Sequence, residues 1–69
     1  MNNQEAAQFF AWAEENLRGF EVEDCDESIH YYLNGVFVGG WAGDAREIFY
    51  KQNDELAKGL RMYSAYNAQ

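Results

Sequence analysis

Apolar residues recur at helical spacing near the start of the chain. Four of them are separated by steps of four, three and four residues, which places them on one side of a helix: Ala6, Phe10, Ala13 and Leu17. Asn2 or Asn3 is suited to cap the start of this helix, and Gly19 is suited to end it. The pattern therefore predicts a helix over residues 4–18 with one buried stripe.

Alternation of apolar and polar side chains predicts a strand over residues 20–25. Phe20 and Val22 point to one side of this strand, and Glu21 and Glu23 point to the other. We therefore expect a half-buried strand whose two apolar residues face the core while the glutamates face solvent.

A β-hairpin is predicted for residues 29–38. The dipeptide Asn34-Gly35 in its middle is typical of a type I′ turn, because both central residues of that turn need a positive φ. A two-residue loop gives three cross-strand pairs: Leu33 with Val36, Tyr32 with Phe37, and Tyr31 with Val38. The first and third pairs are expected to face the core, and the second pair is expected to face away from it.

The last third of the chain is interpreted as helical. Its stripe contains one polar residue and six others at helical spacing: Ala45, Ile48, Phe49, Gln52, Leu56, Leu60 and Tyr63. Asp44 is suited to cap the start of this helix. The residues Asn53-Asp54 can interrupt it, and Asp54 would then cap a second segment that begins at Glu55.

These elements define a single α+β domain over residues 1–69. The predicted order is a helix, a three-stranded antiparallel meander and a second helix (α-β-β-β-α). We expect both helices on one face of the sheet, because an antiparallel sheet can leave its other face exposed to water.

Charge is distributed unevenly along the chain. The formal net charge is −7, and residues 1–35 carry all of it, since residues 36–69 hold four acidic and four basic side chains. Such a surface repels nucleic acid and anionic membranes. The expected partner is therefore a basic protein, with no direct contact to nucleic acid or membrane.

The chain shows no signal for export. It has one cysteine, so an intrachain disulfide is impossible, and no apolar run reaches the roughly 18 residues of a membrane span. The start, MNNQEAAQFF, lacks the basic and apolar segments of a signal peptide. We expect a cytoplasmic protein, in the host bacterial cytoplasm if it is phage-encoded, that is a monomer or a homodimer.

Residues 32–60 resemble the C-terminal part of glutaredoxins, where a strand, a tight Asn-Gly turn, a short strand ending in Gly-Gly and a helix follow in this order. The resemblance implies that Gly40, Trp41 and Asp44 hold a glutathione carboxylate. The first predicted helix lacks a cysteine at its start, and the chain has no proline to match the cis-proline of that family. Cys25 would have to serve as the thiol, although neighbouring carboxylates disfavour its thiolate. A truncated glutaredoxin-like protein that binds glutathione or a thiol partner is therefore an alternative interpretation.

The sequence predicts no metal site, no cofactor and no catalytic group. The candidate metal ligands are Asp24, Cys25, Asp26 and His30. A calcium loop starting at Asp24 would lack the required Gly and Glu at its sixth and twelfth positions, and zinc sites usually contain more than one Cys and one His. The single histidine has no recognisable triad partners. These observations favour a protein that is not an enzyme.

An acidic run, EVEDCDE at residues 21–27, gives the leading functional hypothesis. The predicted partner-binding residues combine carboxylates with aromatic side chains: Glu14, Glu15, Glu21, Glu23, Asp24, Asp26, Glu27, Trp12, Tyr32 and Phe37. The charges of the run would be spaced about 5 Å apart, against about 3.4 Å along a DNA strand.

In its small size, acidity and aromatic content the chain resembles the phage-encoded anti-CRISPR proteins, some of which mimic nucleic acids. The resemblance implies an inhibitor that occupies a basic nucleic-acid-binding groove of a partner. An interaction module that works by obligate pairing is a further alternative.

Overall fold

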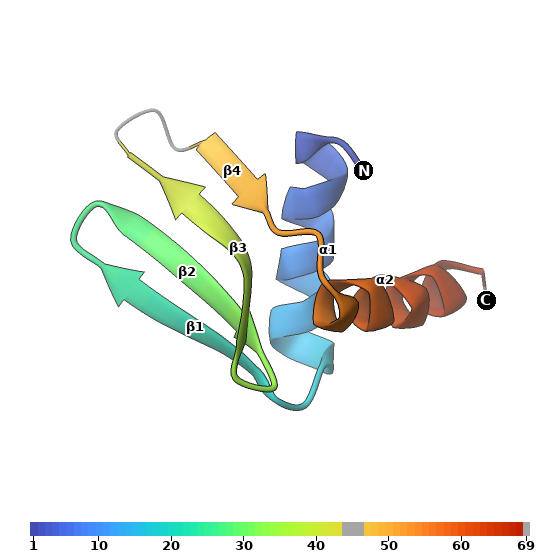
Figure 1. Cartoon of the computed structure of the whole chain (residues 1–69). Coiled ribbons are helices and arrows are strands. Elements are labelled where there is room, and N and C mark those ends of the chain that lie inside the picture. The colour runs from blue at the N-terminus through green and yellow to red at the C-terminus, as the bar shows by residue number, and fades with distance from the viewer. Residues whose placement is uncertain (44–46, 69) are drawn as a thin grey trace.

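The protein is an α+β domain with two helices and a four-stranded antiparallel sheet (Figure 1). The structure, a computed structural model, describes residues 1–43 and 47–68. Its elements are α1 (Asn3–Asn16), β1 (Phe20–Cys25), β2 (Ser28–Leu33), β3 (Val36–Ala42), β4 (Glu47–Tyr50) and α2 (Asp54–Asn67). The strands lie in the order β1-β2-β3-β4, so each strand pairs with its neighbours in the sequence.

The fourth strand corrects the prediction of a three-stranded meander. Residues 47–50, which we assigned to the second helix, pair with β3 and bring Ile48 opposite Trp41. Ile48 is buried, whereas Glu47 before it is exposed and Phe49 after it is half-buried, so burial alternates along this segment as in a strand. The segment also fits helical spacing. Short apolar runs of this kind are ambiguous from periodicity alone, and pairing with β3 decides the outcome here.

The second helix begins later than predicted, and its cap is a different residue. Helix α2 starts at Asp54, and the side chain of Asn53 accepts a hydrogen bond from the backbone N–H of Leu56 at 2.9 Å. Asn53 is therefore the N-cap where we predicted Asp54. The predicted cap at Asp44 lies outside the described residues.

The first helix agrees with its prediction more closely. The side chain of Asn2 accepts a hydrogen bond from the backbone N–H of Glu5 at 2.8 Å and caps the start of α1. The helix ends at Asn16 with Leu17 as its C-cap, two residues before the predicted Gly19, which has a positive φ of 86° in the turn that follows. The buried side of α1 contains Ala6, Phe9, Phe10 and Ala13.

Both helices pack against one face of the sheet (Figure 1). The ring of Phe10 lies 4.5 Å, between centroids, from the ring of Tyr31 on β2. On α2, a Cβ at Gly59 would lie 2.9 Å from Phe9 and 3.2 Å from Leu33, so this helix approaches both α1 and the sheet closely. Phe9, Phe10 and Val38 are the largest fully buried side chains.

A β-bulge in the hairpin changes one of the three predicted pairs. Leu33 pairs with Val36 and Tyr32 pairs with Phe37, as predicted, but Tyr31 pairs with Gly39 and not with Val38. The register shifts between Tyr31 and Tyr32 because β3 contains one extra residue at this point. The extra residue is Val38, whose side chain is fully buried, and Gly39 lies next to the ring of Phe10 on the helix-facing side of the sheet.

Strand β1 is less buried than its apolar residues predict. Val22 is 42% exposed although it pairs with the buried Tyr31 and so lies on the helix-facing side of the sheet. Phe20 is half-buried and packs against Phe10. Because β1 is an edge strand, the helices cover its beginning and leave its outer part in solvent.

Candidate functional site

The face of the sheet opposite the helices carries a group of aromatic side chains. Phe37 of β3 lies at its centre, with ring centroids 5.4 Å from His30, 5.5 Å from Tyr32 and 5.8 Å from Phe49. All four side chains are half-buried, which leaves part of each ring accessible to solvent. We call this surface, together with Glu21 and Glu23 beside it, the open face.

Charged residues border the aromatic group on two sides. On β1, Glu21 pairs with Tyr32 and Glu23 pairs with His30, so both glutamates project from the same side of the sheet as the rings. Across the group, the ammonium of Lys51 lies 6.0 Å from the centroid of the Phe37 ring. Among the residues that the structure describes, the open face is therefore acidic along the β1 edge and has the basic Lys51 at its opposite side.

The structure brings only part of the predicted partner-binding set together. Glu21, Glu23, Tyr32 and Phe37 share the open face. Strand alternation directs Asp24 to the other side, since it pairs with Ile29, while Asp26 and Glu27 form the turn after β1. Glu14 and Glu15 lie on α1, in the helix layer. The ten residues therefore do not form one continuous row.

Trp12 lies apart from the open face, at the contact between the two helices. Its ring centroid is 5.2 Å from that of Tyr63 and 5.5 Å from that of Tyr66, both on α2. The indole Nε1 is buried and has no hydrogen-bond partner among the described residues. The position of Trp12 is that of a packing residue.

His30 and Phe49 belong to the open face and Lys51 borders it, but all three were absent from the predicted set. Phe49 was missed because its segment was assigned to a helix. The signal for His30 was present, since it alternates with the apolar residues of its strand and lies two residues from Tyr32.

One corner of the open face groups a carboxylate, a thiol and an imidazole. The Cys25 sulfur lies 3.5 Å from Oε1 of Glu23 and 3.9 Å from Nδ1 of His30, and Glu23 Oε1 lies 3.4 Å from the same Nδ1. The second ring nitrogen of His30, Nε2, lies 3.3 Å from the hydroxyl of Ser28. Of the four predicted metal-ligand candidates, the structure brings Cys25 and His30 together and adds Glu23 in place of Asp24 and Asp26.

The surroundings of Cys25 make its thiolate unfavourable. Partial burial raises the pKa of the Cys25 thiol, and the hydrogen bond to Glu23 and the negative charge of that carboxylate raise this pKa further. A smaller opposing effect comes from a hydrogen bond with Ser28. The thiol is therefore mostly protonated at neutral pH, as the acidic neighbours in the sequence led us to expect.

Replacing Glu23 with glutamine is expected to make Cys25 react severalfold faster with iodoacetamide at pH 7. The substitution removes the negative charge that raises the pKa of the thiol, so the thiolate fraction increases. Alkylation rates measured by mass spectrometry, in the presence of a chelator, test this. The matched control is Glu21→Gln, which removes a charge from the same strand and is expected to leave the rate nearly unchanged.

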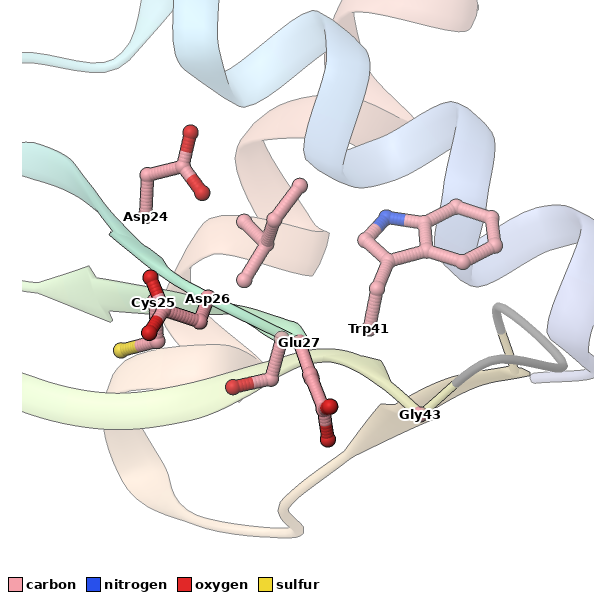
Figure 2. A pocket seen from close by; sticks show the side chains of 8 residues that line it. Asp24, Cys25, Asp26, Glu27, Trp41 and Gly43 are labelled. Atoms are coloured by element: carbon pink, nitrogen blue, oxygen red, sulfur yellow. The ribbon is translucent and has the colours of Figure 1, made fainter.

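A pocket with a volume of about 660 Å³ lies beside the turn between β1 and β2. Figure 2 shows Asp24 and Cys25 leaving β1 in opposite directions, with Asp24 on the side of Trp41. The indole of Trp41 donates a hydrogen bond to the Tyr31 hydroxyl at 3.0 Å, which fixes the aromatic wall of the pocket. The lining residues are Asp24, Cys25, Asp26, Glu27, Ser28, Ile29, Trp41 and Gly43.

Cys25 and Trp41 line the same pocket, but their side chains lie on opposite faces of the sheet. Trp41 pairs with Ile29 and lies on the helix-facing side, whereas the sulfur of Cys25 joins the open face. In addition, β4 separates β3 from the second helix, so the order of elements that carries the glutaredoxin resemblance is interrupted.

Comparison of the chain with protein-family models, with curated protein sequences and with solved structures finds no match. Within residues 1–43 and 47–68, neither helix has the length and apolar character needed to cross a membrane. The fold and the geometry of the open face are therefore the observations on which a functional proposal rests.

Proposed function

We propose that the protein is a non-enzymatic binding protein that places its open face on a basic, nucleic-acid-binding surface of a partner protein and thereby inhibits it. The observation that carries the proposal is the uncovered group of rings around Phe37 with the carboxylates of Glu21 and Glu23 along its edge. Tight protein contacts commonly have aromatic residues at their centre and charged residues around them.

The strand pairing supports this role because it fixes the backbone positions from which the two carboxylates project. Glu21 and Glu23 stand on a strand that is paired along its whole length with β2, so only their side chains have conformational freedom to lose on binding. A preorganised pair of carboxylates can replace two phosphates against lysine and arginine side chains. The net charge of −7 would also speed the approach to a basic partner.

Self-association through the open face is the competing use of the same surface. Two copies meeting there would bring the glutamates of both chains into one contact, and like charges in an interface are destabilising. The charge of the open face therefore favours a basic partner over a second copy. Light scattering distinguishes binding of a basic partner from self-association. The proposal expects the purified protein to be a monomer at micromolar concentration, whereas self-association expects a dimer.

The proposal predicts a partner whose capture depends on salt and on the two open-face glutamates. The tagged protein is expected to retain a nucleic-acid-binding protein from a bacterial lysate at low salt and to release it at high salt, or when duplex DNA is added. The variant Glu21→Gln/Glu23→Gln should weaken this capture by at least tenfold, which corresponds to about 1.4 kcal/mol.

The matched control for this experiment is Glu14→Gln/Glu15→Gln, which removes the same charge from the helix layer. Retention of the partner by the control and its loss from the open-face variant would support the proposal. Equal behaviour of the two variants, or capture that is unchanged by salt and by DNA, would contradict it.

A further inference from the structure

The donor atoms of Glu23, Cys25 and His30 are spaced like the ligands of a tetrahedral zinc ion. All three lie within 4.8 Å of one another. Zinc bonds of about 2.3 Å to sulfur and about 2.0–2.2 Å to nitrogen and oxygen, at tetrahedral angles, place donor atoms about 3.3–3.6 Å apart. Two of the distances here, 3.4 Å and 3.5 Å, fall in this range, and the third is 3.9 Å.

We propose that Glu23, Cys25 and His30 form a Zn²⁺-binding site at the β1–β2 corner of the open face. The thiol gives its proton to solvent as the zinc–sulfur bond forms, Nδ1 of His30 and a carboxylate oxygen of Glu23 supply the second and third ligands, and water fills the fourth position. The inference does not depend on the proposed binding function, and because a bound ion would engage the Glu23 carboxylate, the capture experiment is made with the metal removed by a chelator.

The imidazole is already oriented for this role. A metal on Nδ1 requires the ring proton to be on Nε2, and Nε2 lies 3.3 Å from the Ser28 hydroxyl, which can accept that proton in a hydrogen bond. Metal-binding histidines usually donate their second ring N–H to such a partner, which fixes both the tautomer and the ring orientation. Ser28 is thus a positioning residue for His30.

The backbone holds the three ligands in place without a dedicated loop. Glu23 and His30 are directly opposite each other across the β1–β2 pair, and Cys25 follows Glu23 by two residues on the same side of β1. The register that pairs Glu23 with His30 therefore places all three ligands at one corner. The His30 and Glu23 side chains are 31% and 57% exposed, so an ion has access from solvent.

The ligand chemistry favours zinc over the harder cations. Calcium and magnesium bind oxygen ligands, whereas a thiolate and an imidazole select softer metals such as zinc. The thiolate and the carboxylate together carry two negative charges, which match the charge of the ion. Three protein ligands with one open position are typical of zinc sites that accept water or a further group.

Titration of the reduced, chelator-treated protein with ZnCl₂ in a calorimeter tests the inference. We expect one ion bound per chain and a rise in the melting temperature when zinc is present. With CoCl₂ as a spectroscopic probe, we expect the thiolate-to-cobalt charge-transfer band and the intense visible bands of a four-coordinate ion. Cys25→Ser should remove the charge-transfer band.

Variants at the other positions distinguish a three-ligand site from binding by a thiol alone. Glu23→Gln and His30→Gln should each weaken zinc binding more than Ser28→Ala, for which we expect a loss of about tenfold. Glu21→Gln and Asp24→Asn are the matched controls, since they remove charges next to the site without removing a ligand, and they should bind nearly as the wild type does.

Absence of zinc binding in the calorimeter would overturn the zinc site, and so would either of two further results. One is unchanged zinc affinity in both Glu23→Gln and His30→Gln, which would mean that Cys25 binds the metal alone. The other is a stoichiometry of one ion per two chains, which would place the metal between copies. Far-UV circular dichroism of each variant without metal verifies that the fold is intact.

Discussion

Replacing Phe10 with alanine is expected to lower the free energy of unfolding by about 3–5 kcal/mol. Phe10 is 1% exposed and its ring lies within 6.2 Å, between centroids, of the rings of Phe9, Phe20 and Tyr31. It also covers Gly39 of β3. Alanine would leave a cavity between α1 and the sheet that none of these neighbours can fill.

This loss is large for so short a chain. Domains have about 0.05–0.15 kcal/mol of stability per residue, so a total of roughly 3–10 kcal/mol is expected here. Urea denaturation followed by circular dichroism should show the Phe10→Ala midpoint shifted far toward zero urea. Val22→Ala is the control, because Val22 is on the same side of the sheet but 42% exposed, and its loss should be below about 1 kcal/mol. Similar midpoints for the two variants would contradict the assignment of the core.

A methyl group added at Gly39 is expected to destabilise the fold by about 2–5 kcal/mol, through backbone strain and steric overlap together. Gly39 has a φ of +152°, which side-chain-bearing residues rarely adopt. A Cβ there would also overlap the backbone carbonyl oxygen of Phe49 and lie 2.8 Å from the ring of Phe10. The carbonyl belongs to the paired strand β4 and cannot move without breaking the ladder.

Comparison with Gly35→Ala separates backbone strain from steric overlap as causes of the loss of stability at Gly39. Gly35 also has a positive φ, +81°, but a Cβ there meets no atom within 4 Å. Its substitution should cost only the backbone strain of about 1–2 kcal/mol. Thermal unfolding of both variants measures the difference, and an equal loss would show that contact with β4 and Phe10 contributes nothing at Gly39.

The sequence predicted those parts of the fold that depend on local signals. Asn34 and Gly35 both have positive φ, 52° and 81°, as the hairpin turn requires. The helix cap, which is Asn2 of the two candidates Asn2 and Asn3, and the pairs next to the turn were also predicted correctly. Each of these features is decided by residues close together in the chain, so spacing and residue type are sufficient to find it.

The features that the sequence did not predict depend on contacts between distant residues. Residues 47–50 fit helical spacing and strand alternation equally, and only their pairing with β3 decides between the two. The bulge at Val38 lies next to Gly39, which the ring of Phe10 of α1 approaches closely, a contact between segments almost thirty residues apart in numbering. Periodicity along one segment contains no information on either point.

The corner formed by Glu23, Cys25 and His30 could be predicted from the sequence only in part. The alternation of β1 already placed Glu23 and Cys25 on one side of the strand. Adding His30 required the register of β1 on β2, which pairs Glu23 with His30. The acidic run suggested a continuous row of charges, whereas the pleat of the strand divides it between two faces of the sheet.

The order of strands in the sheet also has a consequence for how the chain folds. Each strand pairs with the next one in the sequence, so the β-hairpins at the β1–β2 and β2–β3 turns close very short loops at little entropic cost. The two helices, by contrast, come from opposite ends of the chain and meet through contacts such as that of Phe9 with Tyr63. Mostly local pairing of this kind favours rapid folding. Contacts between the terminal helices close the longest loop in the chain, so we expect them to form after the hairpins.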